Sequence, residues 1–350
     1  MPVAIPTRPI DHPAAWKARD IAGKDAIAVD LQSRHIDAFE AALADIDRRG
    51  LDDFADVNRD DFPLDAIAED VAAWRDRVEN GQGMVLLRGF PVDRWSQRDV
   101  ERVWFGLGSH FGRAVSQSVM GDLLGHVINV GGEDARHRAY RNARELRMHT
   151  DRCDVVGMFC LRRAKSGGLS SYSSALAVHN HIMETEPELL PSLWAGFHLH
   201  RFGEQPPNEP PYTPLRVPVL SEKDGVTTVV LIGGYVIMAA DEFDAPFSET
   251  DRRALETFER LARDEAFRLD FYMERGEALL FNNCAVLHTR AAFEDHADET
   301  LKRHLMRLWL MDWDDRPVVE GVHYHKGRGG IPKQVEKDPY YAGRKPARGG

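Results

Sequence analysis

The first third of the chain has the apolar spacing of amphipathic helices. Apolar residues recur every three or four positions in residues 34–49 and 66–80, and again in 96–111 after a serine suited to an N-cap, Ser96. Between the second and third of these segments, residues 83–90 (GMVLLRGF) are mostly apolar and end at Pro91, which is typical of a buried strand. The pattern predicts helices packed beside a sheet.

The pattern changes further along the chain. Short apolar or alternating segments are separated by Gly, Pro and Asp, which is typical of a β-rich sandwich or barrel. Only two helical segments, near 177–186 and 248–263, interrupt them. We expect a single domain over residues 1–315 and an irregular tail over 316–350. The predicted strands are residues 126–130, 155–161, 226–232, 235–239, 267–273, 278–281 and 304–311.

Composition narrows the functional classes. The 350 residues include 45 Lys and Arg against 56 Asp and Glu, and this net charge of −11 argues against a general affinity for nucleic acid or anionic membranes. The three cysteines form no CxxC pair, so neither a disulfide framework nor a zinc ribbon is expected. No apolar window is long enough for a membrane span and no secretion signal is evident, which favours a cytoplasmic protein.

A histidine and an aspartate two positions apart, His149 and Asp151, are candidate metal ligands. On an extended chain, side chains at i and i+2 lie on one face and can converge on one ion. The same spacing occurs at residues 35 and 37, within a predicted helix, and at 296 and 298, within a polar insertion. The motif alone is therefore weak. Its position beside the apolar segment 155–161 distinguishes the first pair.

Two later segments add candidate residues. His288 follows a glycine turn, an apolar strand and two asparagines, of which Asn283 fits either a tie to the metal region or a plain turn. In KRHLMRLWL, Arg303 and Arg307 alternate onto one face of an apolar strand. Because an unpaired buried charge is costly, both arginines need an anionic partner. A carboxylate on a neighbouring strand and a bound ligand both fit.

The ordered set of motifs resembles the Fe(II)- and 2-oxoglutarate-dependent oxygenases of the taurine and 2,4-dichlorophenoxyacetate dioxygenase superfamily, which includes clavaminate synthase. The matching elements are His149-Thr150-Asp151, His288, the two arginines of KRHLMRLWL, and Gly167-Gly168-Leu169-Ser170, within a similarity that spans roughly residues 80–312. The resemblance implies a mainly β fold with helices, a double-stranded β-helix (jelly roll) core with N-terminal and inserted helices.

The resemblance also implies roles for individual residues. His149, Asp151 and His288 would bind Fe(II), and two imidazoles with one carboxylate leave positions open for 2-oxoglutarate and O2. Arg303 and Ser170 would hold 2-oxoglutarate. Two further residues are implied in substrate binding, Arg307 and Gln117, and the roles of the two arginines could be exchanged.

The reaction expected from this resemblance is oxidation, most simply hydroxylation, of an unactivated C–H bond, with release of succinate and CO2. The second arginine favours a small substrate with an anionic group, and the family resemblance allows a homo-oligomer. Halogenation is disfavoured because Asp151 occupies the position that chloride would need, whereas desaturation and cyclisation stay open. The alternatives are a cupin-like metal-dependent isomerase or hydrolase, and a non-catalytic protein that binds iron and 2-oxoglutarate.

Overall fold

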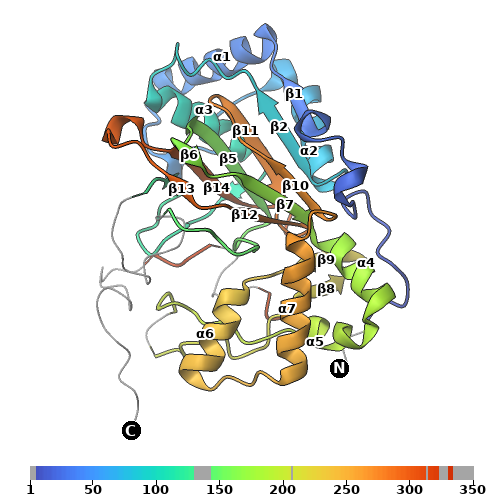
Figure 1. Ribbon diagram of the computed structural model, residues 1–350. Coiled ribbons are helices and arrows are strands. Elements are labelled where there is room, and N and C mark those ends of the chain that lie inside the picture. The colour runs from blue at the N-terminus through green and yellow to red at the C-terminus, as the bar shows by residue number, and fades with distance from the viewer. Residues whose placement is uncertain (1–4, 130–142, 206–207, 313, 323–329, 334–350) are drawn as a thin grey trace.

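The computed structural model describes residues 5–129, 143–205, 208–312, 314–322 and 330–333. Its centre is a pair of facing β-sheets (Figure 1). The larger sheet has the order β1-β2-β11-β5-β14-β3, with β4 also paired to β14; β1 and β2 are parallel, and the other neighbours are antiparallel. Its strands are β1 (Ala28–Asp30), β2 (Met84–Arg88), β3 (Arg113–Ala114), β4 (Leu124–Val127), β5 (Val155–Arg162), β11 (Glu277–Asn282) and β14 (His304–Met311).

The smaller sheet has the order β10-β7-β12 and is antiparallel throughout. Its strands are β7 (Ser170–Ser174), β10 (Arg268–Phe271) and β12 (Val286–Arg290), and two short antiparallel pairs lie outside it, β6 (Ser166–Gly167) with β13 (Phe293–Glu294) and β8 (Leu220–Lys223) with β9 (Val226–Val229). Gly167 has φ +71°, and a Cβ there would lie 2.4 Å from the Ala292 carbonyl oxygen. Glycine is therefore required at the bend that leads into β7.

Helices cover both ends of this core (Figure 1). The N-terminal group packs on the outer face of the larger sheet, and the later group forms a separate hydrophobic cluster that includes Leu287 of β12. The α-helices are α1 (Ser33–Arg49), α2 (Ala68–Glu79), α3 (Gln97–Ser109), α4 (Ala175–Thr185), α5 (Leu190–Ala195), α6 (Gly233–Phe243) and α7 (Glu249–Arg263). Short 3-10 helices occur at Ala18–Asp20, Lys24–Ile27, Phe54–Asp56, Asp65–Ile67, Pro187–Leu189 and Glu299–Leu301.

Strand β11 shows why the larger sheet is so apolar. Ala278 and Leu280 face the helical layer, whereas Leu279 and Phe281 face the space between the sheets. Successive side chains point to opposite faces of a strand, so a strand buried on both faces reads as a continuous apolar run. The jelly-roll prediction is confirmed, and Ser96 caps α3 as expected, since its hydroxyl accepts a hydrogen bond from the Asp99 amide.

One predicted strand is wrong. Residues 235–239 lie in helix α6, where Val236 and Ala239 are buried three positions apart. A short apolar run has no periodicity of its own, so tertiary packing decides between helix and strand. The described parts of the predicted tail, 316–322 and 330–333, contain no helix or strand, and its other residues lie outside the described chain. Among the described helices, none has the length and apolarity needed to cross a bilayer.

Candidate metal centre and its pocket

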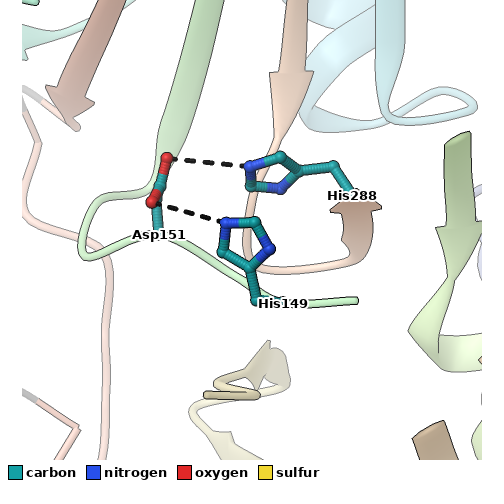
Figure 2. A group of neighbouring side chains, drawn as sticks. All are labelled: His149, Asp151 and His288. Carbon is teal, nitrogen blue, oxygen red and sulfur yellow. Dashed lines mark ion pairs between the residues drawn. The ribbon is translucent and has the colours of Figure 1, made fainter. Parts of the chain in front are cut away.

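Two distant segments bring the candidate metal ligands together. His149 and His288 exchange backbone hydrogen bonds of 3.1 and 3.0 Å, which fixes the stretch before β5 against β12. Their Nε2 atoms lie 3.9 and 3.7 Å from the two oxygens of Asp151 (Figure 2). One ligand atom from each residue lies within 4.8 Å of the others. The three side chains that the sequence singled out therefore converge on one point.

The electrostatics of His288 and Asp151 and the hydrogen bond of His149 suit a metal ion. Burial, His149 and Arg307 lower the pKa of His288 to about 3, so its imidazole is neutral. Burial alone would raise the pKa of Asp151, but Arg307 and the two histidines outweigh it and lower the value to about 2. The Nδ1 atom of His149 lies 2.8 Å from the Arg147 carbonyl, which leaves Nε2 as the free lone pair. Two imidazoles and one carboxylate fit Fe(II).

The other two histidine–aspartate pairs have ordinary surroundings. His35 accepts a hydrogen bond of 2.8 Å from the Gln32 amide at the start of α1, and its Nε2 lies 3.4 Å from Asp70. Asp298 caps a 3-10 helix through the Thr300 amide. Within the described residues, only the group of His149, Asp151 and His288 has metal-ligand geometry.

Two side chains of strand β14 donate hydrogen bonds to the Asp151 carboxylate. Trp309 Nε1 donates to Asp151 Oδ2 at 2.8 Å, and Arg307 Nη1 donates to the same oxygen at 3.2 Å. Gln117 holds Arg307 in turn, because its Oε1 accepts from Arg307 Nε and its Nε2 donates to the Arg307 carbonyl, both at 2.8 Å. Gln117 is fully buried and does not line the pocket. The structure thus gives Gln117 a supporting position, and its direct contact with substrate stays a prediction.

Asn283 ties the loop of Asp151 to the end of β11. Its Oδ1 accepts from the Asp151 amide at 2.8 Å, and its Nδ2 donates to the carbonyls of Asp151 and Cys153 at 2.8 and 2.5 Å. Of the two roles that the sequence allowed, the structure therefore places this side chain as a tie to the metal region. Its neighbour Asn282 instead closes its own turn, accepting from the Cys284 amide at 3.0 Å.

The triad opens onto a cavity of about 320 Å³ between the sheets. Arg303 and Ser170 are both buried and are among the residues that line this cavity. Within the described chain, Nη1 of Arg303 has no hydrogen-bond partner. A buried guanidinium N–H without an acceptor is well suited to an anionic ligand. Arg307 lines the same cavity on the side of Asp151.

Arg290 is a pocket residue to which the sequence analysis gave no role. It is 5% exposed and lines the cavity, and its Nη2 donates to the Arg144 carbonyl. Burial and then the neighbouring Arg303 lower the pKa of Arg290 to about 9. Its spacing from His288 could have indicated this position, because a residue two positions after His288 on a strand lies on the same face as His288.

Comparison with known proteins places this site in a family. The model of the family described as "Taurine catabolism dioxygenase TauD, TfdA family" matches residues 47–309. FR-33289 synthase from Streptomyces rubellomurinus is 27% identical over 277 residues, covering 77% of this chain and 81% of that protein. The taurine hydroxylase-like protein SAT17 from Stachybotrys chartarum is 25% identical over 314 residues, covering 85% and 78%.

Solved structures share the fold at low sequence identity. Asparagine oxygenase in complex with Fe(II), 3-hydroxyasparagine and succinate has a TM-score of 0.65 and 17% identity, covering 88% of this chain and all of that one. The non-haem iron oxygenase OrfP with Fe, succinate and (3S)-hydroxy-L-Arg has a TM-score of 0.60 and 13% identity, covering 81% and 94%.

Proposed function

The chain belongs to the taurine catabolism dioxygenase (TauD/TfdA) family, and from this premise we propose that it hydroxylates an unactivated C–H bond of a small, anionic molecule. It is a 2-oxoglutarate-dependent non-haem iron dioxygenase, with Fe(II) and 2-oxoglutarate as its cofactors and O2 as oxidant. The family decides against the cupin-like isomerase or hydrolase. The substrate, the reaction outcome and the role of each residue are the proposed parts.

The observation behind the proposal is the convergence of His149, Asp151 and His288 at a cavity that also contains buried arginine. The three residues hold Fe(II), which, with 2-oxoglutarate and O2, supplies the oxidising power for the C–H bond. Arg303 binds the distal carboxylate of 2-oxoglutarate with help from the Ser170 hydroxyl. The protein orients the bound molecules and keeps the cavity dry.

Arg307 supports an anionic substrate, because its guanidinium lines the cavity beside Asp151. The structural relatives are consistent with a small polar substrate, since asparagine oxygenase and OrfP were solved with hydroxylated amino acids. Those names also favour hydroxylation among the possible outcomes. Apolar side chains such as Met158 and Ile232 line other parts of the cavity and fit the carbon skeleton of such a molecule.

The first test is anaerobic addition of Fe(II) and then 2-oxoglutarate, followed by the visible charge-transfer band of the chelated keto acid. We expect the band in the wild-type protein and its loss in His149→Ala, with an unchanged circular dichroism spectrum in both. If iron binds and no band forms, the assignment of the 2-oxoglutarate site fails.

The second test concerns the substrate. Succinate release is measured with amino acids, sulfonates and other carboxylic acids, and the product mass distinguishes hydroxylation, which adds one oxygen, from desaturation, which removes two hydrogens. Stimulation by anionic compounds, but not by their amides or esters, supports the proposed substrate class. Equal stimulation by the neutral derivatives contradicts it.

A further inference from the structure

The register of the smaller sheet places Arg290 next to the predicted 2-oxoglutarate site. Arg290 of β12 lies opposite Ser170 of β7, as His288 lies opposite Tyr172. Directly opposed residues of antiparallel strands point to the same face. His288 and Arg290 therefore lie on the cavity side of β12, and Arg290 is one pair further from the metal ligands, beside Ser170.

Arg290 and Arg303 form a buried cationic pair. Each is 5% exposed, and their guanidinium carbons lie 4.6 and 5.1 Å from the centroid of the same ring, Phe293. Nε and Nη1 of Arg290 and Nη1 of Arg303 have no hydrogen-bond partner among the described residues. Such donors are costly to bury unless an acceptor is supplied.

The local charge leaves room for one further carboxylate. Asp295 interacts electrostatically with both arginines, and its Oδ1 accepts from the Arg303 backbone amide. Its other carboxylate oxygen, Oδ2, is buried and has no hydrogen-bond partner among the described residues. Two guanidiniums and one aspartate carry a net charge of +1, which matches a single bound carboxylate.

We propose that Arg290 is a second binding residue for the distal carboxylate of 2-oxoglutarate, shared with Arg303. This inference rests on the proposed function. A carboxylate has about four acceptor positions, enough for two guanidiniums and the Ser170 hydroxyl. The contact with the Arg144 carbonyl uses only Nη2 of Arg290 and leaves the N–H groups of Nε and Nη1 for the ligand.

The test compares two keto acids that share the metal-chelating end. 2-Oxoglutarate has a distal carboxylate, whereas pyruvate has none. Both are titrated anaerobically into the Fe(II)-loaded full-length protein, with the charge-transfer band and calorimetry as readouts. In Arg290→Met we expect the Kd for 2-oxoglutarate to rise about 10–100-fold and the Kd for pyruvate to change less than about 3-fold. Arg290→Lys, which keeps the charge, should fall between.

Controls separate the possible failures. Arg268→Met removes a partly exposed arginine of β10 that pairs with Asp270 and should leave both affinities unchanged. An unchanged 2-oxoglutarate affinity in Arg290→Met, or equal losses for both keto acids, overturns the role of Arg290 while the proposed function stands. If Arg290→Met does not fold, Arg290→Lys decides by the same ratio of affinities. A wild-type protein that binds no 2-oxoglutarate refutes the proposed function and this inference with it.

Discussion

Replacing Asn283 with alanine should weaken both the fold and the metal site. The substitution removes three hydrogen bonds, one from the Asp151 amide and two to the carbonyls of Asp151 and Cys153. Asn283 is 2% exposed, so water cannot readily replace the lost partner. At about 1 kcal/mol for each bond, and somewhat more for a group left buried without a partner, the free energy of unfolding should fall by about 2–4 kcal/mol.

This loss converts into measurable quantities. For a chain of 350 residues the unfolding entropy is about 0.7 kcal/mol/K, so Tm should fall by about 3–6 °C in the metal-free protein. Side chains that orient metal ligands typically change metal affinity by about 10–100-fold. The Kd for Fe(II), measured anaerobically by competition with a chelator, should therefore rise in this range.

Asn282→Ala is the matched control. Asn282 is the neighbouring asparagine, the last residue of β11, and is also buried, but among the described residues its side chain accepts a hydrogen bond only from the Cys284 amide. We expect a loss of stability of about 1 kcal/mol and an unchanged Kd for Fe(II). If Asn283→Ala also leaves the Fe(II) affinity unchanged while lowering Tm, Asn283 is a turn residue and the argument from its contacts with Asp151 is refuted.

Two further predictions concern β14. Trp309→Phe keeps the ring but removes the N–H donor to Asp151, so the Kd for Fe(II) should rise about 10-fold in a chelator competition; an unchanged Kd contradicts this. Burial, His126 and Arg162 lower the pKa of His304 from 6.5 to about 4, so its neutral form stabilises the fold above pH 6.5. This contribution should fall by up to about 1.4 kcal/mol per pH unit between pH 6.5 and 4. In urea unfolding, the free energy of unfolding of His304→Gln should fall less between pH 6.5 and 4 than that of the wild-type protein. Equal pH dependence in the two proteins would contradict this prediction.

Much of the architecture follows from local pattern. Strand β14 alternates as its sequence indicates, with Leu305 and Trp309 between the sheets and Met306 and Leu308 against the helices. Helix α6 could not be predicted from the local sequence pattern, because its apolar run fits a helix or a strand equally well and only its packing decides.

Some residues of the candidate site could likewise be predicted from the sequence and others could not. Residue types and order identified the candidate metal ligands, although the pair at His149 and Asp151 has the same spacing as two other pairs that belong to no such group among the described residues. The contacts of Gln117 and Arg290 depend on which distant segments of the chain become neighbours in the fold. Gln117 contacts Arg307 across 190 positions of sequence, and Arg290 of the smaller sheet comes near Arg303 because both residues line the same cavity. The spacing of residues along the sequence predicts neither contact.

The contacts of Arg303 and Arg307 support different roles for the two arginines. Arg307 donates to Asp151 and to Gln117, so part of its charge already stabilises the carboxylate that would bind iron. Arg303 has no carboxylate within ion-pair distance in the described structure, and it lies beside Ser170 and Arg290. A bound carboxylate is better held by arginines whose charge is not already balanced by a carboxylate of the protein. We therefore infer that the distal carboxylate of 2-oxoglutarate belongs with Arg303, and that Arg307 is left to orient both Asp151 and the substrate.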